Sequence, residues 1–461
     1  MIGFGLLPSA LPREPLEVTL RELPYREPFG AFLSLRKRFP YCFLLESGSG
    51  PEHMAEHTFI GFAPQRVLSL RGGRLIVDGI DAGPATDPLG FLREALPRAA
   101  MPPGEESVYL GGLVGFISYD FVSYLERLPE RFDPGFPAFA MGLYLDGLVF
   151  HHRRKRCVYF SLGPDRFGQV EEALKRGGTP GAFALKDLRP HMSRKTFLEA
   201  VRVAKGYIRA GDVYQVVLSR RLSGRFCGDL AAAYARLREL NPSPYMYFLD
   251  FGDIRIAGSS PEMFLAARGR RLFTCPIAGT RPITGDPEVD EAYRVELLSD
   301  EKERAEHNML VDLARNDIGR VSRFGTVQVT DYMVVERFSH VQHIVSRVEG
   351  ELVDGLDAFD AMAALFPAGT VSGAPKVRAM EIIAELEPEP RGPYAGIVGY
   401  FSTTGDMDSA ITIRTIFARG KTLYLQAGAG IVADSVPERE WDETQGKLGA
   451  LLAALEIGGG R

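Results

Sequence analysis

Two segments of the chain each carry a pair of glutamates three residues apart, a spacing that places both side chains on one face of an α-helix. The pairs are Glu303 with Glu306 and Glu440 with Glu443. Acidic residues also suit the first turn of ordinary exposed helices, and spacing alone favours that interpretation. If the two helices converge, however, the four carboxylates would repel one another unless a hard cation neutralised them. Mg²⁺ suits such a site, because it binds one or two carboxylates and keeps positions for water and ligand oxygens.

Two glycine-rich segments could hold an anion. Gly428, Ala429 and Gly430 follow a predicted strand and would let backbone N–H groups approach a ligand closely. The segment GTVSGAPK, residues 369–376, is predicted to open a helix whose free N–H groups form a second anion site. It is not a nucleotide-binding P-loop, because Pro375 precedes Lys376 and no Ser or Thr follows the lysine. For both segments ordinary turn chemistry is the simpler alternative.

The elements that would position these residues differ between two parts of the chain. Residues 1–185 alternate short apolar runs with Gly and Pro, which indicates a series of β-strands with few helices. Residues 173–188 look like a connector, so we place a domain boundary near residue 185 and a second region over residues 186–461. There Ser193 and Gly211 are predicted to delimit a helix, and strands alternate with helices without a regular βαβ period. We expect an α+β fold of antiparallel sheets covered by helices.

Composition excludes several classes of protein. The chain of 461 residues mixes 54 basic with 59 acidic side chains for a net charge of −5, so we expect no nucleic acid partner. No apolar stretch approaches the ~20 residues that cross a bilayer, and residues 1–15 lack the pattern of a targeting signal. We therefore expect no membrane association and a cytoplasmic location. The four cysteines are widely spaced without a CxxC pair, so we expect core thiols rather than a zinc site or disulfides.

Seven motifs, taken in order, resemble the chorismate-utilising enzymes, the family of the anthranilate, aminodeoxychorismate, isochorismate and salicylate synthases. They are GDVYQVVLSR (residues 211–220), GSSPE (258–262), PIAGTR (276–281), DEKERAEHNMLVDLARND (300–317), FSHVQHIVSRV (338–348), AGTVSGAPKVRAMEII (368–383) and QAGAGIVADSVPEREWDET (426–444). The resemblance covers nearly all of residues 190–455 and, more loosely, GGLVGFISYD at residues 111–120. It implies a four-layered αββα fold in which two large antiparallel sheets pack on each other.

Two positions distinguish this chain from the sister enzymes. Aminodeoxychorismate synthases carry a nucleophilic lysine where this chain has Ala278, and isochorismate and salicylate synthases carry a water-activating lysine where it has Gln215. Alanine leaves space for ammonia beside ring carbon C2, and a neutral glutamine cannot act as a base. The resemblance therefore implies anthranilate synthase activity, which converts chorismate and ammonia to anthranilate and pyruvate through an aminodeoxyisochorismate intermediate. Aminodeoxychorismate synthase activity and an inactive chorismate- or tryptophan-binding regulator remain as alternatives.

The resemblance also implies which residues bind the metal and the substrate. Glu306 and Glu443 would bind Mg²⁺ most directly, with Glu303 and Glu440 assisting. The residues that would hold chorismate are Gly279, Thr280, Tyr394, Arg414, Gly428, Ala429, Gly430 and Lys447. One departure from the family is that many members continue PIAGTRP with an arginine, whereas this chain has Ile283 and Thr284.

The catalytic residues implied by the resemblance are Glu262, His343, Gln215 and Thr370. Glu262 would protonate the C4 hydroxyl group as it leaves, which requires that burial raise the pKa of this carboxyl group. His343 would serve the loss of the proton from C2 that expels pyruvate. The simpler alternatives are a glutamate that caps a turn after Pro261 and a core histidine on a strand.

Two further segments resemble the tryptophan feedback site of this family. They are LLES (residues 44–47) and NPSPYM (241–246), in which Ser47, Pro244, Tyr245 and Met246 would hold L-tryptophan. Without the resemblance they would be a strand end and a proline-rich turn. The chain lacks a Gly-flanked nucleophilic cysteine with a later His and Glu, so a separate glutamine amidotransferase subunit would supply ammonia. The implied assembly is a heterotetramer of two large and two small subunits.

Overall fold

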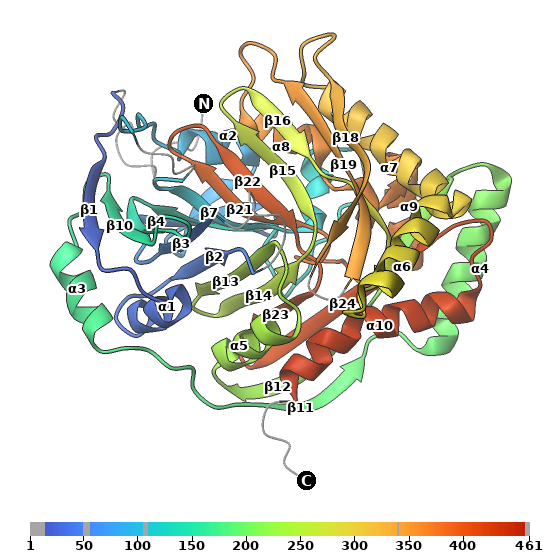
Figure 1. Cartoon of the computed structure of the whole chain (residues 1–461), viewed down its shortest axis with the longest axis horizontal. Coiled ribbons are helices and arrows are strands. Elements are labelled where there is room, and N and C mark those ends of the chain that lie inside the picture. The colour runs from blue at the N-terminus through green and yellow to red at the C-terminus, as the bar shows by residue number, and fades with distance from the viewer. Residues whose placement is uncertain (1–13, 49–55, 105–108, 339–340, 457–461) are drawn as a thin grey trace.

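The computed structural model describes residues 14–48, 56–104, 109–338 and 341–456, which form two large antiparallel sheets with helices (Figure 1). The strands of the first, sheet 1, are β1 (Thr19–Leu23), β2 (Phe43–Glu46), β3 (His57–Gly61), β9 (Asp146–His151), β10 (Arg156–Ser161), β11 (Phe183–Pro190), β12 (Gln215–Gly228), β13 (Tyr245–Phe251), β14 (Ile254–Ser260), β20 (Gly373–Ala374), β23 (Thr415–Arg419) and β24 (Thr422–Ile431). Their order is β1-β10-β9-β3-β2-β13-β14-β23-β24-β12-β11, and the short β20 also pairs with β12.

Sheet 2 has the same number of described strands. They are β4 (Arg66–Arg71), β5 (Arg74–Val77), β6 (Ile80–Pro84), β7 (Gly112–Ile117), β8 (Phe139–Tyr144), β15 (Met263–Arg268), β16 (Arg271–Thr274), β17 (Ile277–Pro282), β18 (Gln328–Arg337), β19 (Val341–Glu351), β21 (Ile397–Ser402) and β22 (Met407–Ile411). Their order is β17-β19-β16-β15-β22-β21-β7-β8-β4-β5-β6, and β18 also pairs with β19.

The helices lie on the outer faces of the two sheets. They are α1 (Pro28–Arg36), α2 (Pro88–Glu94), α3 (Phe167–Lys175), α4 (Arg194–Ala210), α5 (Leu230–Leu240), α6 (Pro287–Ser299), α7 (Glu301–Gly319), α8 (Ala358–Leu365), α9 (Lys376–Leu386) and α10 (Pro437–Leu455), with short 3₁₀ turns η3 (Tyr119–Tyr124) and η4 (Gly369–Val371). Apolar residues of α1, α3, α5 and α10 form one core with sheet 1, and α4 and α9 pack against β12 and β24. Helices α6 and α7 pack along β17 and β19 of sheet 2.

Aromatic rings fill the space between the two sheets. Phe43 of β2 contacts Tyr144 of β8 with ring centroids 4.7 Å apart, and Phe59 of β3 contacts Tyr400 of β21 at 5.8 Å. The faces of the two sheets are thus packed directly on each other, with helices outside both. This arrangement confirms the expected α+β fold with four αββα layers.

Several helix ends follow the local sequence signals. The Ser193 side chain accepts a hydrogen bond from the Thr196 N–H at the start of α4, and Gly211 ends that helix with φ +85°. Asp300 caps α7 by accepting from the Lys302 and Glu303 N–H groups, and Pro437 is the first residue of α10. Both glutamate pairs therefore lie in the opening turns of long helices, as predicted.

The predicted series of strands with few helices in the N-terminal region is confirmed, because its described residues form β1 to β10 with the short helices α1, α2 and α3. Two other predictions about the elements were wrong. The presumed connector contains β11, whose mostly exposed side chains hide its pairing with β12. The glycines near Gly428 do not follow a strand but lie within β24, where Gly428 pairs with Ser219 of β12.

The proposed boundary near residue 185 falls inside β11 and stays a prediction. Strands from both parts of the chain pair within each sheet, for example β2 with β13 and β7 with β21. All four cysteines are free thiols, but Cys227 is exposed at the end of β12, which corrects the expectation that all would be buried.

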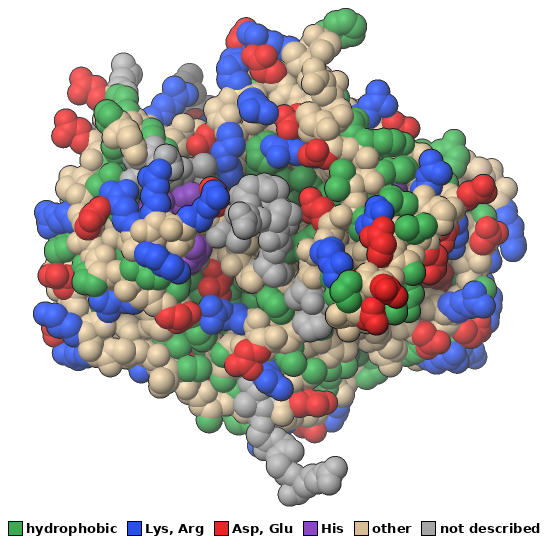
Figure 2. Space-filling model, viewed as in Figure 1, with side chains coloured by type: hydrophobic (Ala, Val, Ile, Leu, Met, Phe, Trp, Pro, Cys, Tyr) green, Lys and Arg blue, Asp and Glu red, His purple; other side chains and the backbone are tan. Residues whose placement is uncertain are grey.

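The surface shows no single sign of charge on the face in Figure 2, where acidic and basic side chains are interspersed. Among the described helices, none is both long and apolar enough to span a bilayer. Residues 1–13, most of the segment considered for a targeting signal, lie outside the described residues.

Candidate active site

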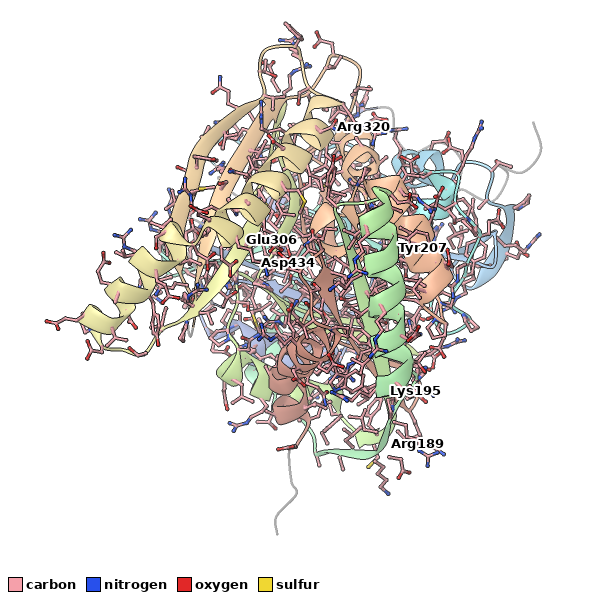
Figure 3. The ribbon with its side chains drawn as sticks, turned by 90° about the vertical axis from the view of Figure 1, so that its right-hand side faces the viewer. Arg189, Lys195, Tyr207, Glu306, Arg320 and Asp434 are labelled. Atoms are coloured by element: carbon pink, nitrogen blue, oxygen red, sulfur yellow. The ribbon has the colours of Figure 1, made fainter. Side chains whose placement is uncertain are left out.

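The helices that carry the two glutamate pairs approach each other near their N-terminal ends. Burial raises the pKa of Glu440 on α10, and the neighbouring Glu443 carboxylate raises it further. The Lys302 ammonium of α7 is among the groups that lower it, so charges on one helix act on the other. Figure 3 views this side of the molecule, with Glu306 on α7 and Asp434 just before α10. The opening turns of the two helices thus interact through their charges, while the convergence of all four carboxylates on one cation stays a prediction.

Three of the four glutamates contact a nitrogen donor. Arg281 Nη1 lies 3.5 Å from Glu303 Oε1, and Lys447 Nζ lies 2.6 Å from Glu443 Oε1. Gln215 Nε2 donates a hydrogen bond of 3.1 Å to Glu306 Oε1. Within the described parts of the chain, no three acidic, histidine or cysteine side chains are close enough to form a ready metal site.

The donor set nevertheless fits a hard divalent cation. Burial raises the pKa of Glu303, and the Glu306 carboxylate raises it further, although Arg281 opposes both effects. Like-charged carboxylates thus crowd together on each helix, and a cation bound between them would relieve the repulsion. Carboxylate oxygens are also the ligands that Mg²⁺ prefers. Magnesium binding stays a prediction that these residues can satisfy.

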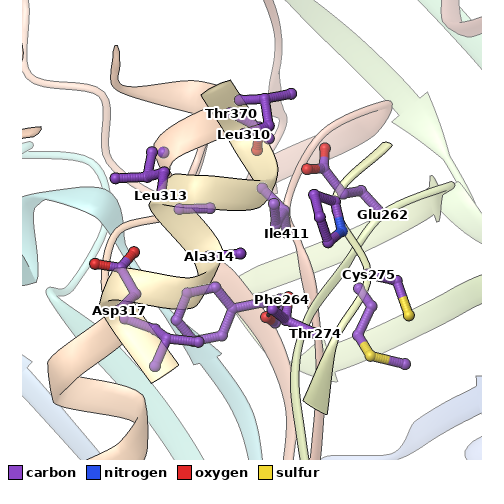
Figure 4. Close-up of a pocket in the computed structure, with 15 residues that line it drawn as sticks. Glu262, Phe264, Thr274, Cys275, Leu310, Leu313, Ala314, Asp317, Thr370 and Ile411 are labelled. Atoms are coloured by element: carbon purple, nitrogen blue, oxygen red, sulfur yellow. Dashed lines mark hydrogen bonds between the residues drawn. The ribbon is translucent and has the colours of Figure 1, made fainter. Parts of the chain in front are cut away.

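Glu262 lies between β14 and β15 with its carboxyl group in a pocket opposite α7. Figure 4 shows it beside Thr370 of η4, with Leu310 and Leu313 of α7 across the pocket. Burial raises the pKa of Glu262 to about 7, while the Thr370 hydroxyl and the Lys447 ammonium lower it. A carboxyl group with such a pKa holds a proton near neutrality and can release it, which is what a general acid requires.

His343 on β19 is held in one tautomer by its neighbours. Its Nδ1 lies 2.7 Å from the Gly279 carbonyl oxygen, which can only accept, so Nδ1 carries the proton and Nε2 is left with its lone pair. The Thr280 hydroxyl lies 3.2 Å from the same nitrogen. Burial lowers the pKa of His343, and the Arg414 charge lowers it further. The imidazole is therefore a neutral ring that can accept a proton at Nε2.

Glycines let the side chains of the site come close to strand β24. A Cβ atom on Gly428 would lie 2.9 Å from the Tyr394 hydroxyl, and one on Gly430 would lie 2.7 Å from Gln215 Nε2. Lys447 Nζ donates to the Gly428 carbonyl at 3.0 Å. The Ala429 side chain points the other way, into the core formed with α4 and α9, so only its backbone faces this region.

Gly279 has a similar role on β17. Its φ of +64° favours glycine, and a Cβ atom there would lie 3.2 Å from Glu303 Oε2. Gly279 therefore lies between the His343 ring, which it binds through its carbonyl, and the first glutamate pair.

Arg414 carries a charge that none of the described residues neutralises. Its side chain has no hydrogen bond or ion pair to any described residue, and burial lowers its pKa. Its charge acts on His343, which places it near the imidazole. A partly buried guanidinium without a protein acceptor is suited to bind a ligand carboxylate in a bidentate manner.

The structure thus brings together the predicted metal, substrate and catalytic residues, although their roles stay predictions. Sequence reasoning missed Arg281, which lies 3.2 Å from Asp300 as well as close to Glu303. The sequence contained a signal for the role of Arg281, because this residue is the last of the PIAGTR motif. It also missed Arg391, a fully buried arginine that contacts Tyr394.

The four predicted tryptophan-binding residues line a separate pocket between the two sheets. Ser47, Pro244, Tyr245 and Met246 come from sheet 1 and its loops, and Tyr400 and Asp408 of sheet 2 face them. The Tyr245 hydroxyl donates to Asp408 Oδ1 at 3.1 Å. The Ser47 hydroxyl is buried and has no hydrogen-bond partner among the described residues. An unsatisfied buried hydroxyl suits a polar group of a ligand.

Comparisons with known proteins agree with this arrangement. Residues 80–453 match the family described as chorismate binding enzyme. The chain is 46% identical over 442 residues to anthranilate synthase component 1 of Methanothermobacter thermautotrophicus, an alignment that covers 95% of this chain and 94% of that protein. The crystal structure of anthranilate synthase component I from Streptococcus pneumoniae matches with a TM-score of 0.77 at 40% identity, over 86% of this chain and 92% of that one. The menaquinone-specific isochorismate synthase of Escherichia coli shares the fold, with a TM-score of 0.72 at 20% identity over 96% and 95% of the two chains.

Proposed function

The chain belongs to the family of chorismate-binding enzymes, and on that premise we propose that it is the large subunit of an anthranilate synthase. It would catalyse the first step of tryptophan biosynthesis, as a cytoplasmic carbon–oxygen lyase that depends on Mg²⁺. The observation that carries the proposal is that the chain supplies both a buried acid, Glu262, and a neutral base, His343. The acid has a raised pKa, and the base is fixed in one tautomer by the Gly279 carbonyl.

Chorismate is a dianion, so a chain of net negative charge needs local cations to bind it. Arg414 and Tyr394 would bind the enolpyruvyl carboxylate, together with the backbone of β24 near Gly428. Lys447 would leave its contact with Glu443 to bind the ring carboxylate. Mg²⁺ held by the four glutamates would supply further positive charge at that carboxylate. Gln215 would keep Glu306 oriented through the hydrogen bond between them.

In the first step, the lone pair of ammonia attacks ring carbon C2, the ring double bonds shift, and the bond from C4 to its hydroxyl oxygen breaks. Glu262 gives its proton to that oxygen, which leaves as water, and the added nitrogen loses a proton to solvent. The raised pKa of Glu262 makes the protonated form available near pH 7. Thr370 beside Glu262 would orient the carboxyl group.

In the second step, His343 Nε2 accepts the proton from C2 of the amino intermediate. The electrons of that C–H bond complete the aromatic ring, and the bond between C3 and the enolpyruvyl oxygen breaks. Pyruvate and anthranilate are the products. The tautomer fixed by the Gly279 carbonyl leaves Nε2 able to accept that proton.

We further propose that L-tryptophan binds the pocket lined by Ser47, Pro244, Tyr245 and Met246 and inhibits the enzyme. The support is the buried Ser47 hydroxyl, which has no partner among the described residues, and the apolar walls around it. A glutamine amidotransferase subunit would supply ammonia, in a heterotetramer of two large and two small subunits.

Aminodeoxychorismate synthase is the second candidate, because it uses the same substrate. The position of its nucleophilic lysine is Ala278, next to Gly279 on β17, which opposes that activity. An inactive regulator is opposed by the intact glutamate pairs and by the raised pKa of Glu262.

The test is to incubate the purified chain with chorismate, Mg²⁺ and an ammonium salt. We expect anthranilate and pyruvate in equal amounts, with glutamine inactive until the amidotransferase subunit is added. Chromatography separates ortho- from para-aminobenzoate and so distinguishes the two synthases. Formation of the para isomer, or efficient use of glutamine by the chain alone, would contradict the proposal.

A further inference from the structure

Arg391 is the largest fully buried side chain among the described residues, and it has no part in the proposed reaction steps. It forms a bidentate ion pair with Glu387, in which Nε donates to Oε2 at 2.9 Å and Nη2 to Oε1 at 2.7 Å. The side chains are 1% and 5% exposed, so both charges are removed from water. Because removing two charges from water costs free energy, such a buried ion pair contributes little net stability. The other hydrogen bonds of the pair indicate a second role.

The pair fills a gap at one edge of strand β12. In the described sheet, β20 pairs with β12 only at Gln215 and Val216, and β11 begins to pair at Leu222. Between them, Arg391 Nη2 donates to the Val217 carbonyl at 2.7 Å. Glu387 Oε1 accepts from the Ser219 N–H at 2.7 Å. The two side chains thus satisfy backbone groups that a neighbouring strand would otherwise satisfy.

Arg391 also contacts two other segments of the site. Its Nη1 donates to the Val371 carbonyl at 2.7 Å, directly after Thr370. Its guanidinium carbon lies 5.7 Å from the centre of the Tyr394 ring. Tyr394 in turn lies against Gly428, and Thr370 lies beside Glu262. One side chain therefore joins β12, η4 and the tyrosine that faces the glycines of β24.

We propose that Arg391, held by Glu387, is a positioning residue that fixes the relative positions of Tyr394, the Thr370 turn and β12. Through Tyr394 it sets the affinity for chorismate, and through Thr370 it sets proton transfer by Glu262. The effect on catalysis rests on the function proposed above. Arginine is needed because its planar guanidinium group directs several N–H donors at fixed angles, whereas lysine has a single ammonium group.

The variant Arg391→Lys keeps the positive charge but cannot reach Glu387, Val371 and Val217 together. We expect KM for chorismate to rise about tenfold and kcat to fall about tenfold, each the effect of one or two misplaced hydrogen bonds. Because Thr370 lines the same pocket as the Glu262 carboxyl group, its displacement should also shift the pH limit of kcat that reflects this acid. Glu387→Gln, which keeps one acceptor oxygen, should change the same parameters less.

Arg166→Lys is a matched control, because Arg166 pairs with the buried Asp146 on β9, far along sheet 1 from β12. It should lower the melting temperature and leave KM, kcat and the pH profile unchanged. If Arg391→Lys and Glu387→Gln behave in the same way as this control, the pair is only structural and the inference is wrong.

Hydrogen exchange gives a readout that does not depend on turnover. In Arg391→Lys, the amides of residues 217–219, 370–372, Gly392 and Tyr394 should exchange faster while the rest of the chain is unchanged. Unchanged exchange in these segments, or a uniform increase, would overturn the inference even in an active enzyme. If Arg391→Lys shows this exchange pattern but the wild-type chain converts no chorismate, the proposed function is refuted while the positioning role of Arg391 stands.

Discussion

The catalytic region lies near the ends of both sheets, whereas the second pocket lies between them. The first is built from β12 and β24 of sheet 1, β17 and β19 of sheet 2, and the opening turns of α7 and α10. It gathers carboxylates, lysine and arginine, several with shifted pKa values. The second pocket is lined mainly by apolar and aromatic side chains from β2, β13, β21 and β22.

The difference in lining indicates different roles for the two sites, catalysis in the first and binding of a small molecule in the second. Crowded charges with perturbed pKa values are typical of sites where protons move and charge develops. A mostly apolar pocket with a few polar groups is typical of a site that only binds a small molecule. The two are linked by one hairpin, because Tyr245 in the second pocket pairs with Ser260, two residues before Glu262. A ligand that shifts Tyr245 would thus act on the strand that leads to the acid.

The largest expected effect is that of removing a metal ligand. Glu306→Gln should lower ammonia-dependent activity by more than about 100-fold at ordinary Mg²⁺ concentrations, because the charge that binds the cation is lost. Folding should be kept, since Glu303 loses a like-charged neighbour. The measurement is turnover over a Mg²⁺ titration, with Glu301→Gln at the first position of α7 as the control. Equal activity of the two variants would show that Glu306 belongs to an ordinary exposed helix.

Glu262→Gln should lower turnover by about 10²- to 10⁴-fold, the usual contribution of a general acid. The same substitution should also change the free energy of unfolding, in a direction that depends on pH. The native pKa is raised from 4.5 to about 7, so ionising Glu262 destabilises the folded wild type progressively between these pH values and fully above them. The variant should therefore match wild type at pH 4 and be more stable by about 3 kcal/mol at pH 8. Urea unfolding at both pH values measures this; a difference independent of pH would refute the buried-acid assignment.

His343→Met should affect one chemical step only. The variant should still bind chorismate and add ammonia, because those events do not use the imidazole, while the proton loss slows by about 10²- to 10⁴-fold. Chromatography should show a non-aromatic 2-amino compound accumulating as anthranilate and pyruvate fall together. Normal anthranilate formation would make His343 structural, and a complete lack of chorismate consumption would place it in the first step.

The smallest expected effect lies in the second pocket. Ser47→Ala should raise the tryptophan concentration for half inhibition about tenfold, the value of one hydrogen bond to a charged ligand group. It should leave kcat and KM unchanged without tryptophan, because no catalytic residue is touched. Ser161→Ala, a buried hydroxyl on β10, is the control. If both variants are inhibited as wild type is, tryptophan does not bind at Ser47.

Features that depend on residues within one or two turns of each other could be predicted from the sequence alone. The cap at Ser193, the proline that opens α10 and the spacing of the glutamates follow from such local geometry, whereas Asp300, expected in the first turn of α7, is its N-cap. The family motifs added the residues of the site and the layered fold. A segment whose side chains are almost all buried, such as α1, or mostly exposed, such as β11, gave no usable period and was missed.

How these residues act on one another follows from the three-dimensional arrangement of the sheets and cannot be predicted from local sequence. The tautomer of His343 depends on the Gly279 carbonyl, 64 positions away in the chain, and the pKa of Glu262 depends on burial under segments as distant as Thr370. The gap that Arg391 fills exists because β20 and β11 pair with different parts of β12. Burial, charge and hydrogen-bond partners come from strands that sheet pairing brings together, so no local pattern along the chain specifies them.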